Sequence, residues 1–228
     1  MPITVKWFAH SAFLLTINGR HLLIDPFISE NPLAEGTDIR TVPADIIAVT
    51  HAHGDHVGDT IAIAKRTGAT VVCNFEMGNW FESQGVKQVE RGNPGGTYHG
   101  DFVSLKWTAA IHTSSFPDGS NGGEANGFII TADDRKLYFA GDTTLFGDME
   151  LIGDEGIDVA FVPIGDTYTM GIDDSIKAIK LIRPRYVIPM HYNTFPPIVQ
   201  DVTDWAEKVN RETDAQPIVN DPGMEFEI

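Results

Sequence analysis

Three histidines and one aspartate fall within seven positions in the stretch THAHGDH, residues 50–56. Neutral imidazoles and carboxylates suit borderline divalent ions, zinc in particular, and residues two apart converge on one ion where the backbone curls at Gly54. A solvated loop would explain a single histidine. Four ligand-type residues in six positions after an apolar run instead predict a metal site, made by His51, His53, Asp55 and His56.

Three more ligand-type residues lie where later apolar runs stop. His112 ends LKWTAAIH, Asp142 ends KLYFAGD and His191 ends RYVIPMH. Each alone has an ordinary explanation as a cap, a turn acceptor or a partly buried imidazole. Open α/β sheets place functional groups at strand ends, however, so together the three predict further ligands for the same site.

Short β-branched or aromatic runs separated by Gly, Asn and Asp must position these residues. They predict strands over residues 4–10, 12–17, 21–27, 46–50, 70–74, 86–90, 102–110, 127–132, 136–141, 158–165 and 185–190. Amphipathic segments predict helices over 57–67, 75–84, 173–182 and 197–212, the third capped by Asp173 or Asp174. We expect turns at Asn18-Gly19 and Asp133-Asp134, and a surface loop beside the site over residues 114–127.

Length and charge narrow the possible partners. The 228 residues suit one domain over residues 1–228. Sixteen Lys and Arg against 32 Asp and Glu give a net charge of −16, which disfavours nucleic acid as a partner. We expect no export signal and no membrane insertion, and the single cysteine, Cys73, favours a reducing, cytoplasmic setting and a buried strand position. The sequence leaves open whether the protein forms a homo-oligomer.

The spacing His51-Ala52-His53-Gly54-Asp55-His56 resembles the H-x-H-x-D-H signature of the metallo-β-lactamase superfamily. His112 in AIHTSS, Asp142 in FAGDT and His191 in IPMHYN match the later ligands of that superfamily in order. The resemblance implies an α/β fold, the four-layer αββα sandwich, with the metal site along one edge. It also implies that His51, His53 and His112 hold one ion, that Asp55, His56 and His191 hold a second, and that Asp142 bridges them.

The opening WFAHSAFLLTINGRHLLIDPF is similar to small bacterial and archaeal metal-dependent hydrolases related to L-ascorbate-6-phosphate lactonase and N-acylphosphatidylethanolamine phospholipase D. His10 matches an early histidine of that group, and we expect it to meet substrate or a water at the metals, or to have a structural hydrogen-bonding role. Asp25 matches an early acid and should orient a ligand. PIGDTYTMG also resembles the group, although Asp166 stands where glycine is expected.

Two paired ions lower the pKa of a water molecule and polarise an electrophile, so the site predicts hydrolysis with Asp55 as the proton acceptor. The substrate we expect is a small soluble ester, either a lactone or a phosphodiester. A nuclease is the alternative, and a non-catalytic metal-binding module is a weaker one. Zinc is the first choice of ion, with manganese, nickel and iron open. Residues beside the ligands are candidate substrate contacts: Thr143, Thr169, Tyr192 and Asn193.

Overall fold

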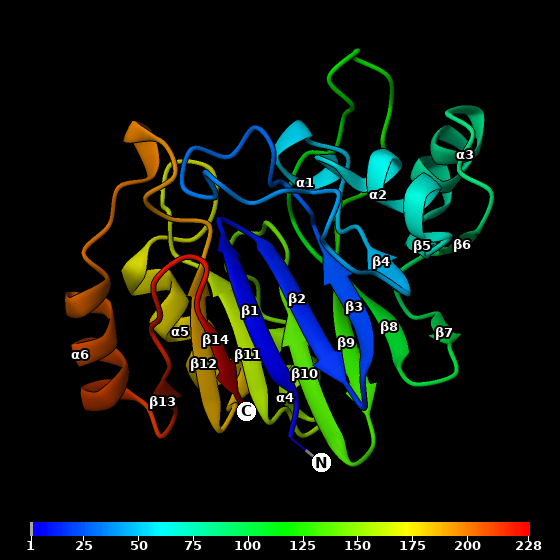
Figure 1. Cartoon of the computed structure of the whole chain (residues 1–228). Coiled ribbons are helices and arrows are strands. Elements are labelled where there is room, and N and C mark those ends of the chain that lie inside the picture. The colour runs from blue at the N-terminus through cyan, green and yellow to red at the C-terminus, as the bar shows by residue number, and fades with distance from the viewer. Residues whose placement is uncertain (1) are drawn as a thin grey trace.

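The computed structural model describes residues 2–228 and shows two β-sheets packed face to face between layers of helices (Figure 1). The first sheet has the strand order β14 (Glu225–Glu227), β1 (Thr4–Ala9), β2 (Ala12–Ile17), β3 (Arg20–Ile24), β4 (Ile46–Ala48), β5 (Thr70–Asn74), β6 (Val89–Gly92). The second has the order β13 (Gln216–Pro217), β12 (Tyr186–Met190), β11 (Val159–Pro163), β10 (Arg135–Phe139), β9 (Asn126–Ala132), β8 (Ser104–Ala109), β7 (Thr97–His99). This is the predicted αββα sandwich.

Helices cover the outer face of each sheet because each has one apolar stripe. Helices α2 (Thr60–Thr67) and α3 (Phe75–Ser83) pack Ile63 and Phe81 against the first sheet. Helices α4 (Met149–Gly153), α5 (Ile172–Ile182) and α6 (Val202–Glu212) pack against the second sheet, where Trp205 is fully buried. Among residues 2–228, no helix has both the length and the apolar character needed to cross a membrane.

Both sheets are mixed, and the strand directions bring the ligand-bearing segments together. Strands β4, β8, β10 and β12 all end at the same edge, the upper one in Figure 1, and we call it the site edge. The opposite edge carries the predicted turns, which are confirmed: Asn18, Gly19 and Asp133 have φ values of 52°, 77° and 52°. Asn, Asp and Gly are the residues that tolerate this left-handed backbone.

The predicted helix over 57–67 is wrong in its start and its continuity. Helix α1 (Gly54–Val57) begins inside the histidine motif, and Gly58, with φ 38°, separates it from α2. A Cβ at Gly58 would lie 2.4 Å from the carbonyl oxygen of Pro26, so only glycine allows this close crossing. The predicted helix is therefore interrupted at Gly58, where the backbone packs closely against residues 26–27.

Two other helix predictions need correction. Gly171 is the N-cap of α5, so Asp173 and Asp174 lie in its first turn, where they favour the helix dipole without capping. The segment 197–212 divides into a 3-10 turn, η1 (Pro196–Ile198), and α6, because Val199 is extended and Asp201 caps the second helix. The sequence missed α4, β7, β13 and β14, each too short to show a period.

Candidate metal centre

The predicted ligands converge at the site edge from four strand ends. His51 follows β4, His53 and Asp55 come from the start of α1, and His112 and His191 follow β8 and β12. Ligand atoms of one group lie within 4.8 Å of one another: His51, His53 and His112. A second such group contains the residues assigned to the other ion, together with one more histidine: His10, Asp55, His56 and His191.

Asp142 lies between the two groups. Its Oδ2 lies 3.0 Å from His191 Nε2, 3.4 Å from His56 Nε2 and 3.6 Å from His112 Nε2. His51 Nε2 is 4.0 Å away, and Asp142 is only 2% exposed. One carboxylate oxygen thus contacts imidazoles that the sequence assigned to two different ions. That is the position a bridging ligand requires.

Asp25 and Thr50 orient two of the imidazoles from behind. Thr50 donates its hydroxyl to Asp25 Oδ2 at 2.7 Å, so its oxygen accepts from His51 Nδ1, 3.1 Å away. His56 Nδ1 donates to Asp25 Oδ2, also at 2.7 Å. Both rings therefore turn Nε2 toward the centre. Asp25 orients a ligand as the sequence predicts, whereas Thr50 was missed because a threonine beside a histidine is an ordinary strand residue.

Burial keeps the first group of imidazoles neutral. Desolvation lowers the pKa of His51 well below its ordinary value, and the neighbouring His56 lowers it further. Desolvation also lowers the pKa values of His53 and His112, although Asp55 and Asp142 respectively oppose the change. All three rings thus offer a lone pair near neutral pH, as a metal ligand must.

The carboxylates remain ionised despite their burial. Burial opposes ionisation of Asp142, but His191 and His56 together hold its pKa well below the usual range. Burial likewise opposes protonation of His56, yet the charges of Asp142 and Asp25 raise its pKa well above the usual range. For Asp55, burial is outweighed by the hydrogen bond with His10 and by the charge of His56, so its pKa is lowered. A cation bound at the centre would balance the negative charges of Asp142 and Asp55.

His10 is fully buried beside the second group. Its Nε2 lies 3.2 Å from Asp55 Oδ2, its Nδ1 lies 2.9 Å from Thr194 Oγ1, and its ring centroid is 4.1 Å from that of His191. Burial, followed by the charge of His191, lowers the pKa of His10 to about 4, so the ring is neutral. Because Asp55 can only accept, His10 donates from Nε2 and accepts at Nδ1 from the Thr194 hydroxyl.

Strained backbone holds His10 in this place. Ala9 and His10 have φ values of 119° and 56° in the turn between β1 and β2, and neither is glycine. The carbonyl of His10 accepts from Trp7 Nε1 at 3.0 Å and from the backbone N–H of His191 at 3.2 Å. These contacts over-determine the conformation, which is how unfavourable dihedrals persist at functional sites.

The remaining predicted residues have different surroundings. Thr143 and Tyr192 are buried, and the ring of Tyr192 stacks on Trp7. Asn193 is exposed and Thr169 half-buried. Asp166 has φ 63°, which explains why glycine is expected there and why aspartate is tolerated. Thr194 was missed because nothing in the sequence marks the third residue after a ligand.

The donor set fits divalent metal ions. Ligand atoms about 2.0–2.2 Å from a tetrahedral ion lie roughly 3.3 Å apart, and the measured separations around Asp142 Oδ2 are 3.0–4.0 Å. His56 Nε2, Asp142 Oδ1 and His191 Nδ1 are buried without a hydrogen-bond partner. Buried polar atoms rarely lack partners, and a bound ion accounts for the two that belong to the centre itself, His56 Nε2 and Asp142 Oδ1.

Fold and site together define a metal-dependent hydrolase of the metallo-β-lactamase superfamily. The family model of the beta-lactamase superfamily domain matches residues 4–191, and the chain belongs to this superfamily and, within it, to the UPF0173 metal-dependent hydrolases. A UPF0173 metal-dependent hydrolase of Thermus thermophilus is 47% identical over 210 residues, covering 92% of each chain. One of Methanosarcina mazei is 43% identical over 230 residues, covering 99% of each chain.

A solved structure agrees with this assignment. Igni18, a metallo hydrolase from the hyperthermophilic archaeon Ignicoccus hospitalis, superimposes with a TM-score of 0.91 at 37% identity. The match covers 100% of this chain and 99% of that one. The chain is therefore similar to these hydrolases over its whole length, and the metal cluster falls in the shared part.

Proposed function

We propose that the protein is a two-metal hydrolase that cleaves small soluble esters, either lactones or phosphodiesters. The observation that carries this proposal is the position of Asp142, whose Oδ2 contacts imidazoles of both ligand groups. In this assignment His51, His53 and His112 hold the first ion, Asp55, His56 and His191 hold the second, and Asp142 is shared. The two substrate types follow from the sequence resemblance between the opening segment and a group related to a lactonase and a phospholipase.

When bound, the two ions lower the pKa of a water molecule and polarise the scissile group. The chain's own residues then control the proton. The side chain of Asp55 is 30% exposed, so one part of it reaches the open side of the centre and accepts a proton there. His10 donates a hydrogen bond to Asp55 Oδ2, and Thr194 in turn holds the His10 ring through its Nδ1. His10 thus acts as a positioning residue for Asp55.

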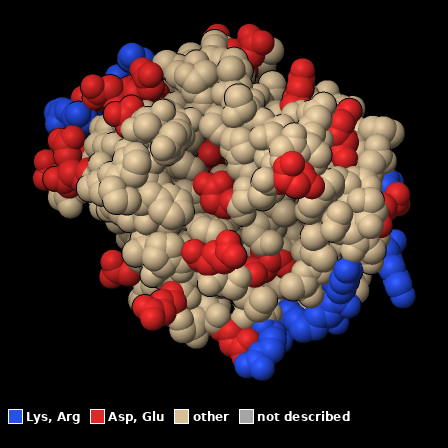
Figure 2. Space-filling model, turned by 90° about the horizontal axis from the view of Figure 1, so that it is seen from above, with Lys and Arg blue, Asp and Glu red and all other residues tan. Residues whose placement is uncertain are grey.

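The distribution of charge disfavours the nuclease alternative. Polynucleotides bind through many Lys and Arg side chains that release counterions. Viewed onto the site edge, the molecule shows carboxylates near the centre and keeps the lysine and arginine side chains near its periphery (Figure 2). The net charge of −16 adds long-range repulsion. A small molecule that reaches the ions directly suits this surface better.

The ligand atoms guide the choice of metal ion, and the single cysteine guides the choice of cellular compartment. Five imidazoles and two carboxylates favour zinc, and manganese, nickel or iron fit the same atoms. Cys73 is buried and unpaired, and burial raises the pKa of its thiol, so it needs no oxidising compartment and cannot serve as a nucleophile. We place the enzyme in the cytoplasm with a small-molecule substrate as its partner.

A side-by-side assay tests the proposal. The zinc- or manganese-loaded enzyme is given lactones, chromogenic phosphodiesters and structured RNA, with Asp55→Ala as the contamination control. We expect at least one small ester to be cleaved with a higher kcat/KM than RNA, and Asp55→Ala to abolish that cleavage. If RNA is the far better substrate and its cleavage also needs Asp55, the enzyme is a nuclease.

A further inference from the structure

A cavity of about 340 Å³ lies against the turn that carries the metal ligands. Its walls are mainly apolar and come from four separate segments, with the apolar lining Phe27, Gly54, Val57, Ile61, Trp80 and Pro117. Half-buried Ile61 and Trp80 form part of this wall, from α2 and α3. The volume is within the range that small-molecule ligands occupy in proteins.

The cavity and the metal centre share structural elements. Gly54 stands between the ligands His53 and Asp55, and its Cα faces Pro117, whose Cγ would lie 3.4 Å from an added Cβ. Phe27 reaches from the cavity to the buried His10 ring, with centroids 5.8 Å apart. The cavity therefore lies beside the reacting centre.

The walls are held in place before any ligand binds. Asp59 accepts from the backbone N–H groups of Ile28 and Ser29 at 3.0 and 2.8 Å, which fixes the segment after Phe27. Trp80 stacks on Phe116, with centroids 3.9 Å apart and an interplanar angle of 16°. A preformed apolar cavity loses little conformational freedom when it takes up an apolar group.

The segments that form the site edge contain no lysine or arginine side chain. Within the described part of the chain, neither lysine nor arginine occurs in residues 25–39, 49–59, 109–127, 140–148, 164–171 or 191–201. The cavity itself has three carboxylates among its lining residues: Glu30, Asp59 and Asp118. At this cavity the three carboxylates oppose the approach of a negative substrate.

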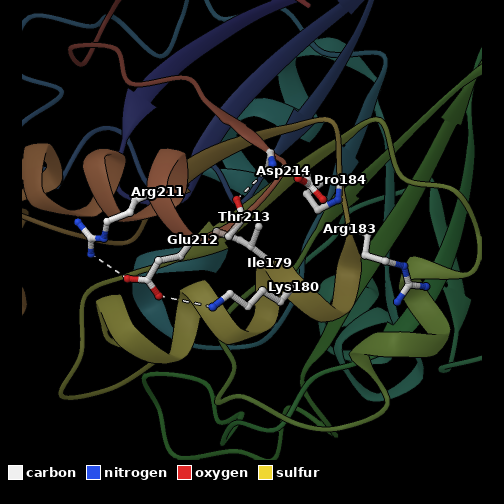
Figure 3. A pocket seen from close by; sticks show the side chains of 9 residues that line it. Ile179, Lys180, Arg183, Pro184, Arg211, Glu212, Thr213 and Asp214 are labelled. Atoms are coloured by element: carbon white, nitrogen blue, oxygen red, sulfur yellow. Dashed lines mark hydrogen bonds and ion pairs between the residues drawn. The ribbon is translucent and has the colours of Figure 1, made fainter.

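Another cavity, of about 520 Å³, offers no alternative site. It lies between the C-terminal ends of α5 and α6 (Figure 3), at the edge opposite the metal centre, because α5 ends just before β12 begins. Its cations are already paired: Lys180 and Arg211 contact Glu212, and Arg183 contacts Asp154. An anion there would have to displace the protein's own carboxylates.

We propose that the substrate is an uncharged carboxylic ester or lactone whose apolar acyl or aryl group occupies the cavity beside Gly54. This inference rests on the proposed hydrolysis of small esters and narrows it, because it excludes phosphodiesters as the preferred class. The uncharged carbonyl faces no electrostatic barrier at the site edge. The apolar group gains contacts with Ile61 and Trp80 while the carbonyl meets the centre beside Asp55.

A series of p-nitrophenyl esters tests the inference on the metal-loaded enzyme. We expect kcat/KM to rise from acetate to butyrate to hexanoate by about fourfold per methylene until the cavity is filled. The anion bis(p-nitrophenyl) phosphate should react more slowly than any of them. Equal rates for acetate and hexanoate, or a faster phosphodiester, would overturn the inference while leaving ester hydrolysis intact. Failure of all these substrates with both ions bound would instead count against the proposed function.

Filling the cavity gives a matched comparison. Ile61→Trp should lower the ratio of kcat/KM for hexanoate to kcat/KM for acetate toward one, with the metal content unchanged. Leu151→Trp is the control, because Leu151 lies on α4 and is 65% exposed. An equal loss for acetate and hexanoate in Ile61→Trp would contradict the assigned position of the acyl group.

A binding measurement tests the position of the apolar group without relying on catalysis or on the Ile61→Trp variant. Trp7, Trp107 and Trp205 are buried, whereas Trp80 lines the cavity. Hexanamide should therefore change the tryptophan fluorescence of the metal-free protein, acetamide should change it far less, and Trp80→Phe should lose the response. An undiminished response in Trp80→Phe, or none in the wild type, would place the apolar group elsewhere.

Discussion

The two edges of the sandwich differ in which residues adopt a left-handed backbone conformation. At the opposite edge, left-handed backbone at residues other than glycine occurs at Asn18, Asp133 and Arg183, all of them in turns or at a helix end. At the site edge, it occurs at side chains placed for chemistry or beside them: Ala9, His10, Asp25, Asp166, Thr167, His191 and Asn193. Strain is thus concentrated where positions matter for function and is otherwise confined to ordinary turns.

The edges differ equally in how they neutralise charge. At the opposite edge Glu155 is bound by Lys106 and Lys136 at 2.6 and 2.9 Å, so the protein balances its own carboxylate. At the site edge Asp142 is surrounded by imidazoles and no lysine or arginine contacts it. The site edge therefore depends on bound cations for its balance, and the opposite edge does not.

Asp142→Ala should have the largest effect. It removes the oxygen shared by both ligand groups, so we expect both ions to be lost and kcat/KM to fall by about three orders of magnitude or more. Elemental analysis and the ester assay measure the two effects. Full metal retention in this variant would remove Asp142 from the centre.

Single histidine variants should separate the two ions. His112→Ala should weaken the first site and His191→Ala the second, each by about a hundredfold in affinity, while the other site stays occupied. Isothermal titration with zinc distinguishes the sites. If both variants bind two ions as tightly as the wild type, the assignment of ligands is wrong.

Asp25→Asn should have an intermediate effect, because Asp25 contacts His56 and Thr50 but no ion. Loss of such an orienting carboxylate typically costs about 10–100-fold in metal affinity or activity. Asp45→Asn is the matched control at the opposite edge, where Asp45 accepts from Arg20 Nε and the backbone N–H of His21. If Asp25→Asn and Asp45→Asn changed the zinc affinity equally, Asp25 would have no special role in orienting the metal ligands.

Glu155→Gln should have the smallest effect. Hydrogen bonds from Lys106 and then Lys136 lower the pKa of Glu155 to about 2, so its stabilising contribution is complete above its ordinary pKa of 4.5 and is lost as pH falls toward 2. Partial exposure limits that contribution to about 1 kcal/mol or less. Urea unfolding at pH 7 and pH 3 should show the variant's deficit shrinking at the lower pH, with unchanged hydrolysis and metal content.

Most strands and the ligand cluster could be predicted because both leave short-range marks in the sequence, whereas the sandwich was implied by the resemblance to the metallo-β-lactamase superfamily. Apolar runs with period two give the strands, and the motif around Gly54 gives four ligands on one turn. The structure brings the three later ligands to the same place because β8, β10 and β12 end at one edge.

Other features depend on contacts between distant segments and leave no such mark. Thr194 meets His10 across 184 positions, and the break at Gly58 follows from the crossing of residues 26–27. The cavity beside Gly54 joins segments around residues 27, 61, 80 and 117, which no local pattern connects. That residues 1–228 fold as one domain stays a prediction, which coincident thermal unfolding by two probes would test.

The most direct test of the two-metal centre is the number of ions bound per chain. Protein purified without chelator and reconstituted with excess zinc or manganese should contain close to two ions by elemental analysis, because seven ligand-type residues exceed what one tetrahedral ion can use. A reproducible value of one ion per chain, unchanged at higher metal concentration, would contradict the two-metal centre.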